Sequence, residues 1–146
     1  MIRSIHHTAI STADMQRALE FYCGLLGFEQ IWTRTWEIGD RMTDRVMGLQ
    51  QSSGKIAMLA LGDSQIEMFE FRSPEPQKND PNRPVCNHGI THLCFEVTDL
   101  DGEYARLKAA GMHFHCPPQD DGAAKVTYGR DPDGNVIELV EMKAME

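Results

Sequence analysis

The sequence predicts an α+β fold of two tandem βαβββ modules, which together form a curved, cup-like mixed sheet with flanking helices. Two observations lead to this prediction. The chain repeats one pattern of strand, turn, helix and glycine stop, first from His7 and again from His92. Each repeat then closes with a similar strand that carries a glutamate, Glu67 in the first half and Glu138 in the second. The expected modules are residues 1–72 and 89–146, with a linker at 73–88.

Two helices have recognisable start and stop signals. Asp14 and Asp99 are expected N-caps, because a carboxylate accepts hydrogen bonds from the free N–H groups of the first helical turn. A glycine follows each helical pattern at the position where the backbone becomes left-handed. The spacing of apolar residues between these signals predicts helices over 15–26 and 100–110.

The strands are predicted from short runs of apolar, β-branched and aromatic residues bounded by turn residues. These segments are 5–11, 31–37, 55–61, 65–72, 90–97, 113–116, 124–130 and 136–141. Between the halves, the segment 73–84 holds four prolines and almost no apolar residue, which is typical of a surface linker.

Composition and charge exclude several classes of function. The chain has 146 residues, of which 41% are hydrophobic and 25% charged, enough to build a core. A formal net charge of −8 without a basic cluster argues against binding nucleic acid, since that affinity rests on neutralising phosphates. No apolar run approaches the ~20 residues that span a bilayer, and no secretion signal is visible. We therefore expect a cytoplasmic protein with a small-molecule substrate.

The alternation of side chains along the strands predicts where the polar residues point. His92 lies on the face opposite to the apolar residues that pack on the helix, and the same parity applies to His7, with His6 pointing away. Glu67 and Glu138 each share a strand face with apolar residues. Taken singly, each of these residues would be read as structural. A buried carboxylate is costly without a compensating cation, and a His and a Glu that recur in a duplicated unit favour a metal site.

The chain resembles the vicinal oxygen chelate superfamily, which includes glyoxalase I, bleomycin resistance proteins and extradiol dioxygenases. The resemblance covers nearly the whole chain. It rests on the segments His7-Thr-Ala-Ile, Phe21-Tyr-Cys-Gly-Leu-Leu-Gly-Phe28, Gly89-Ile-Thr-His92 and Asp131-Pro-Asp-Gly-Asn-Val-Ile-Glu138.

The resemblance implies one divalent metal ion (Zn, Ni, Co, Mn or Fe) bound by His7, Glu67, His92 and Glu138, a set similar to that of bacterial glyoxalase I. It also implies a lyase or isomerase that abstracts a proton next to a carbonyl and forms a metal-stabilised enediolate. Glu138 would be the catalytic base, with Glu67 as its counterpart.

Other functions stay open at this point. The same fold serves non-catalytic ligand-binding and drug-resistance proteins, acyl-CoA epimerases and ring-cleaving dioxygenases. Bound metal would separate the enzymes from a sequestering protein, because sequestration does not need four metal ligands. Exposed sheet edges in such small modules, together with the resemblance, favour a homodimer.

The first half carries an extra segment. The separation between the predicted metal ligands is 60 residues in the first half and 46 in the second. The segment 32–54 contains the additional residues and is rich in large apolar side chains, although most insertions are surface loops. We expect it to flank the cup, with Arg41 or Arg45 available to meet an anionic group of the substrate.

Overall fold

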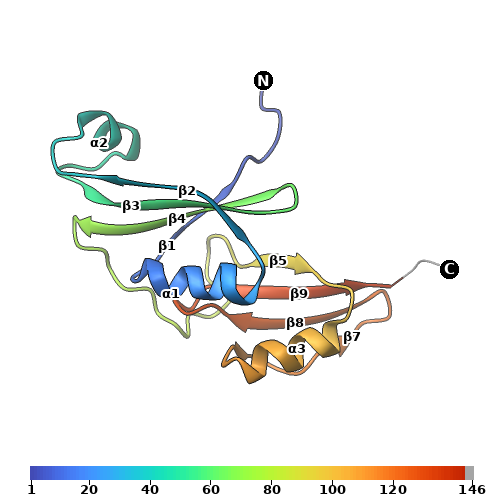
Figure 1. The fold of residues 1–146 in the computed structure, drawn as a ribbon. Coiled ribbons are helices and arrows are strands. Elements are labelled where there is room, and N and C mark those ends of the chain that lie inside the picture. The colour runs from blue at the N-terminus through green and yellow to red at the C-terminus, as the bar shows by residue number, and fades with distance from the viewer. Residues whose placement is uncertain (144–146) are drawn as a thin grey trace. The chain divides into compact units, whose positions relative to one another are not determined.

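A computed structural model describes residues 1–143. The chain divides into two compact units, Met1–Lys78 and Asn79–Glu146 (Figure 1). Each unit has its own mixed sheet with a helix between its first two strands. This confirms the predicted α+β class and the duplication.

The first unit contains a four-stranded sheet in the order β1-β4-β3-β2. Strand β1 is parallel to β4, and the other neighbours are antiparallel. The elements are β1 (Thr8–Ser11), α1 (Met15–Leu19), the π-helix η1 (Glu20–Leu25), β2 (Glu29–Trp36), α2 (Arg41–Met47), β3 (Ser53–Leu61) and β4 (Ser64–Ser73).

The second unit repeats this topology. Its strands follow the order β5-β9-β8-β6, with β5 parallel to β9 and the short strand β7 paired with β8. The elements are β5 (Leu93–Glu96), α3 (Leu100–Ala109), β6 (His113–Phe114), β7 (Gln119–Asp120), β8 (Ala124–Arg130) and β9 (Val136–Met142). In both units the first strand therefore lies at the sheet edge, beside the strand that carries the predicted glutamate.

The predicted helix starts are confirmed, but the first helix changes its pitch. Asp14 accepts a hydrogen bond from the backbone of Arg17, and Asp99 does so from Gly102. The helix expected over 15–26 is α-helical for one turn and then continues as η1. The wider turn of a π-helix places one extra residue in the turn. The adjacent aromatic residues Phe21 and Tyr22 are both buried in this stretch.

The edge strands are shorter than the sequence suggested. Strands were expected over 5–11 and 90–97, but β1 begins only after His7 and β5 only after His92. The first ladder pair of β1 is Thr8 with Ile66. The neighbouring strands continue past these points, because β4 already pairs with β3 at Ser64 and β9 already pairs with β8 at Val136. Both histidines therefore stand at the entrance to a strand.

The extra segment of the first unit contains a helix that the sequence analysis did not predict. Asp40 caps α2 by accepting a hydrogen bond from the backbone N–H of Thr43 at 3.0 Å. Gly48 ends the helix with a φ of 68°. An N-cap aspartate and a stop glycine were thus present in the sequence and could have identified α2.

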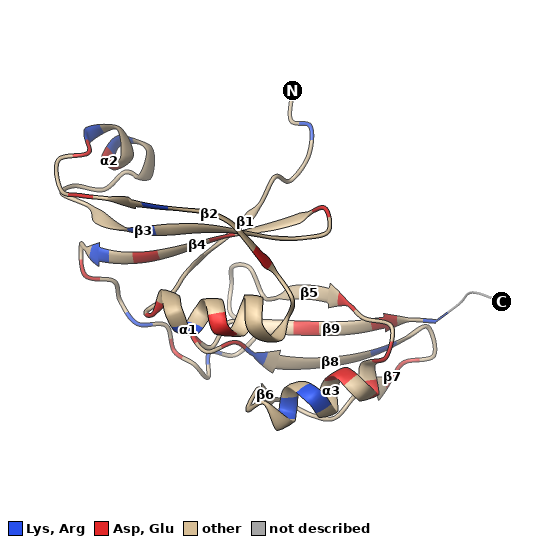
Figure 2. Ribbon diagram, viewed as in Figure 1, with Lys and Arg blue, Asp and Glu red and all other residues tan. Residues whose placement is uncertain are grey.

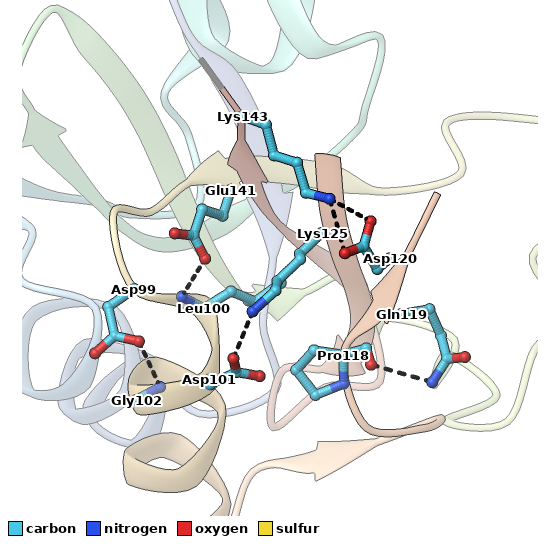
Figure 3. A network of polar contacts seen from close by, with 10 residues as sticks. All are labelled: Asp99, Leu100, Asp101, Gly102, Pro118, Gln119, Asp120, Lys125, Glu141 and Lys143. Carbon is cyan, nitrogen blue, oxygen red and sulfur yellow. Dashed lines mark hydrogen bonds and ion pairs between the residues drawn. The ribbon is translucent and has the colours of Figure 1, made fainter. Parts of the chain in front are cut away.

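A glutamate in each unit ties the helix to the sheet. Glu70 accepts a hydrogen bond from the backbone N–H of Met15 at 2.5 Å, and Glu141 accepts one from Leu100 at 3.0 Å. Figure 3 shows the second of these contacts beside the Asp99 cap. A carboxylate at a helix N-terminus satisfies a free N–H and interacts favourably with the helix dipole. This fixes the helix against one face of each sheet.

Charged residues of both signs are distributed over both units (Figure 2). In the second unit, ion pairs join Lys125 to Asp101 and Lys143 to Asp120, both at 2.6 Å (Figure 3). Such exposed pairs contribute little to stability individually. In the described part of the chain, no helix is long and apolar enough to cross a membrane.

Candidate metal-binding site

In the first unit, the predicted histidine and glutamate lie side by side. His7 Nε2 is 3.3 Å from Glu67 Oε2. The parallel register pairs Ala9 with Glu67, and His7 lies two residues before Ala9, just ahead of β1. The exposed fractions are 33% for the His7 side chain and 17% for Glu67. The pair is thus partly buried but still accessible.

The second unit reproduces this arrangement. His92 Nε2 is 2.9 Å from Glu138 Oε2, and Cys94 is the register partner of Glu138. The offset between histidine and glutamate is therefore the same in both units. Within residues 1–143 there is no cluster of three or more His, Cys, Asp or Glu side chains that could hold a metal ion. Each unit by itself supplies two donors.

The other ring nitrogen of each histidine is held by the preceding residue. Nδ1 of His7 lies 2.8 Å from Nδ1 of His6, and Nδ1 of His92 lies 2.9 Å from the Thr91 hydroxyl. His6 was expected to point away from His7, but strand parity does not apply there because both residues precede β1. In both units Nδ1 is occupied and Nε2 faces the carboxylate, as in metal ligands oriented by a second hydrogen bond.

The pair distances fit adjacent ligands of one ion. Metal–ligand bonds to imidazole and carboxylate are about 2.1 Å, so two ligands at a right angle are roughly 3 Å apart. The two His–Glu distances, 3.3 Å and 2.9 Å, match this separation. Two nitrogen and two oxygen donors suit first-row divalent metals.

The residues that face the two glutamates across the sheet differ. Met58 pairs with Glu67, whereas Tyr128 pairs with Glu138. The Tyr128 ring lies 5.1 Å from the His92 ring. Burial, followed by the charge of Glu138, raises the pKa of the Tyr128 phenol, which therefore stays protonated and can donate a hydrogen bond. The sequence analysis missed Tyr128; the strand register is the signal that identifies it.

Cys94 shares the face of the second pair. Burial, with a hydrogen bond to Glu138 as the second cause, raises the pKa of the Cys94 thiol to about 11. All four cysteines are free. Cys94 is thus a neutral neighbour of Glu138 at physiological pH.

The remaining histidines lie outside the two pairs. His88, His113 and His115 are exposed. His115 Nε2 accepts a hydrogen bond from Arg130 Nε at 3.0 Å, and burial followed by the Arg130 charge lowers the pKa of His115. This histidine therefore stays neutral as an acceptor in a structural network.

The turn before β9 is structural. The Asp131 side chain is 5% exposed and accepts hydrogen bonds from the backbone N–H groups of Asp133 and Asn135. Arg41 and Arg45 lie on α2, and both are exposed. Their contact with a substrate stays a prediction.

Comparisons with known proteins identify the family. A family model described as the Glyoxalase/Bleomycin resistance protein/Dioxygenase superfamily matches residues 4–139, which include both His–Glu pairs. A 2-epi-5-epi-valiolone epimerase from Actinomyces sp is 29% identical, with coverage of 97% of this chain and 80% of the relative. A lactoylglutathione lyase from Pseudomonas aeruginosa is 28% identical, with coverage of 93% and 81%.

Among solved structures, a glyoxalase family protein from Bacillus cereus superposes with a TM-score of 0.88. The sequence identity is 24%, and the superposition covers 99% of this chain and 97% of that one. At this identity the likeness shows a shared fold.

Proposed function

Because the chain belongs to the Glyoxalase/Bleomycin resistance protein/Dioxygenase superfamily, we propose that it is a metal-dependent lyase or isomerase of the glyoxalase I type. The observation that supports this proposal is the pair of equivalent His–Glu contacts, which share one register and one orientation of the imidazole. A duplicated unit that folds for structural reasons alone does not need a His and a Glu at both equivalent positions.

We propose that His7, Glu67, His92 and Glu138 bind one divalent ion, with one pair from each unit of the same chain or of two subunits. Zn, Ni, Co, Mn and Fe all accept this donor set. When bound, such an ion holds two oxygens of a substrate and stabilises the negative charge that develops beside its carbonyl group.

The protein side chains would move the proton. Glu138 would accept a proton from the carbon next to the carbonyl, and Glu67 would act as its counterpart on the other side. The raised pKa values of the Tyr128 phenol and the Cys94 thiol keep both groups protonated beside Glu138. An epimerase and a lyase among the relatives fit this step. Return of the proton to the other face of the same carbon inverts that carbon, and return to the adjacent carbon rearranges the carbonyl compound.

Elemental analysis of the purified protein tests the metal site. We expect about one divalent ion per four-ligand set, and loss of stoichiometric metal when Glu67 or His92 is replaced by alanine. His88→Ala is the matched control, because this histidine is exposed and lies outside both pairs. Full metal retention in both ligand variants would exclude the proposed site.

A substrate screen tests the reaction class. Hemithioacetals should be isomerised if the chain is a lactoylglutathione lyase, and acyl-CoA thioesters should exchange their α-proton with solvent deuterium if it is an epimerase. Loss of turnover in the Glu138→Gln variant, with the protein still folded and its metal content unchanged, would assign the base. A dioxygenase would instead consume oxygen in the presence of iron.

A non-catalytic binding protein of the same fold is the alternative from another class. It predicts stoichiometric ligand binding without proton exchange and without a need for metal. The expected homodimer stays a prediction, which sedimentation at micromolar concentration tests directly.

A further inference from the structure

One face of β4 carries aromatic residues beyond the His7–Glu67 pair. Alternate residues of a strand point the same way, about 7 Å apart, so Phe69 and Phe71 follow Glu67 along one face. Their rings are nearly parallel, at 10°, with centroids 5.6 Å apart. Both side chains are half-buried, so part of each ring is accessible. We call Phe69 and Phe71 the aromatic shelf.

A buried tryptophan supports the shelf from beside it. The Trp36 ring is T-shaped to both phenyl rings, with centroids 6.3 Å from Phe69 and 5.4 Å from Phe71. Edge-to-face contacts of this kind are favourable beyond the apolar area that they bury. Trp36 is only 3% exposed, so it belongs to the support and not to the accessible surface.

The extra segment of the first unit fixes this tryptophan. Trp36 Nε1 donates a hydrogen bond to Ser52 Oγ at 3.0 Å, and the Ser52 hydroxyl donates to Asp44 of α2. Asp44 also accepts hydrogen bonds from the backbone N–H groups of Gln51 and Ser52. A Cβ on Gly54 would lie 2.5 Å from the Trp36 ring, so glycine leaves the space that the indole fills. Helix α2 thus has a structural link to the shelf.

The second unit has a different surface at the equivalent positions. Val140 and Met142 follow Glu138 along β9, in place of two phenylalanines. The described connection between its helix and β8 contains β6 and β7, and no tryptophan. The stacked pair of phenylalanines is therefore specific to the strand of Glu67, whereas the Glu138 pair has the single ring of Tyr128 beside it.

We propose that the aromatic shelf binds an apolar or aromatic group of the substrate, next to the oxygens that the His–Glu pairs recognise. The proposal rests on the proposed function and narrows its substrate class. The substrate is an α-hydroxy or α-oxo carbonyl compound that carries a ring or a branched apolar group beside its two oxygens. Accessible apolar surface that continues a polar site is the usual composition of a small-molecule pocket.

Binding of mandelate and lactate tests the shelf. Both are α-hydroxy acids with the same two oxygens, and mandelate adds a phenyl ring. In the Trp32→Phe variant, Trp36 is the remaining tryptophan and reports binding by fluorescence. We expect mandelate to bind at least ten-fold more tightly than lactate, which corresponds to about 1.4 kcal/mol.

Substitution of the shelf should remove this preference. In a Trp32→Phe, Phe71→Ala protein, mandelate affinity should fall to within about three-fold of lactate, while lactate affinity and metal content stay unchanged. Phe71→Leu keeps apolar bulk without the ring and should give an intermediate loss if the alanine variant does not fold. Val46→Ala, on the exposed side of α2, is the control and should keep the full preference.

Three results would overturn the proposal: equal binding of mandelate and lactate, an unchanged preference in both Phe71 variants, or binding of neither acid. A failure of the proposed function is detected by a separate measurement, the metal content of the His92→Ala variant. Full metal retention in that variant would contradict the proposed metal site. The two failures are therefore distinguishable.

Discussion

Replacing Asp131 with alanine should destabilise the second unit strongly. The carboxylate of Asp131 organises the turn that leads into β9, the strand of Glu138. Oδ1 accepts hydrogen bonds from the backbone N–H of Asp133 at 2.9 Å and of Asn135 at 2.8 Å. Oδ2 accepts one from the Asn135 side-chain amide at 2.9 Å. Alanine removes both acceptor oxygens and all three hydrogen bonds at once.

The expected cost follows from these contacts. A hydrogen bond to a charged group contributes about 1.5–3 kcal/mol, and buried donors left without a partner are costly. The contributions share one carboxylate and do not add fully, so we expect a loss of about 3 kcal/mol in the free energy of unfolding. For a chain of this size the melting temperature should fall by about 6–12 °C. Asp131→Asn keeps one oxygen acceptor and should lose roughly half as much.

Denaturant unfolding and thermal melts measure this loss. Asp63→Ala is the matched control, because Asp63 is exposed in the corresponding turn between β3 and β4 of the first unit. It should change the free energy of unfolding by less than about 0.5 kcal/mol. An Asp131→Ala protein as stable as the Asp63→Ala protein would refute the role assigned to the turn.

Three further predictions concern contacts within each unit. Gly54→Ala should lower stability by more than about 2 kcal/mol in melts, because its Cβ would clash with the Trp36 ring and with the backbone of β4. The hydrogen bond from Ser52 holds the pKa of Asp44 below its usual value, so its stabilising contribution is present above about pH 4 and lost as the pH falls below it. The wild-type protein should therefore lose more stability between pH 5 and about pH 3 than Asp44→Asn does, and equal losses would contradict this. Glu141→Gln should weaken the N-terminus of α3 by about 1 kcal/mol in denaturant melts, because the neutral amide interacts less with the helix dipole.

The duplication was predictable because its signals are local. An aspartate N-cap and the alternation of a strand involve residues close in sequence, and Asp14 and Asp99 took the predicted roles. Parity predicted that each histidine shares a face with its glutamate. The ladders give both units the same offset, although His7 and His92 themselves precede β1 and β5. The alternation pattern could not predict the residues at which the edge strands β1 and β5 begin.

The surroundings of the His7–Glu67 and His92–Glu138 pairs differ, and these differences were not predictable in the same way. Tyr128 meets Glu138 only through the register of β8 and β9, and that register depends on the geometry of the Asp131 turn. The role of α2 depends on the Ser52 contact between a helix and the loop that precedes β3. Each of these contacts depends on how two elements pack against each other, which the sequence pattern does not show.

On the proposed function, these differences suggest a division of labour between the units. Metal binding requires the same donors from both units, so the His–Glu pairs can be equivalent. Turnover of an asymmetric substrate requires different surroundings for each pair. Glu138 has a phenol beside it, which suits proton transfer, whereas Glu67 has Met58 opposite and Phe69 two residues further along its strand. Glu138→Gln should therefore reduce turnover with little effect on the preference between mandelate and lactate, and a shelf variant should do the reverse. If both variants changed turnover and preference equally, the two half-sites would share one role.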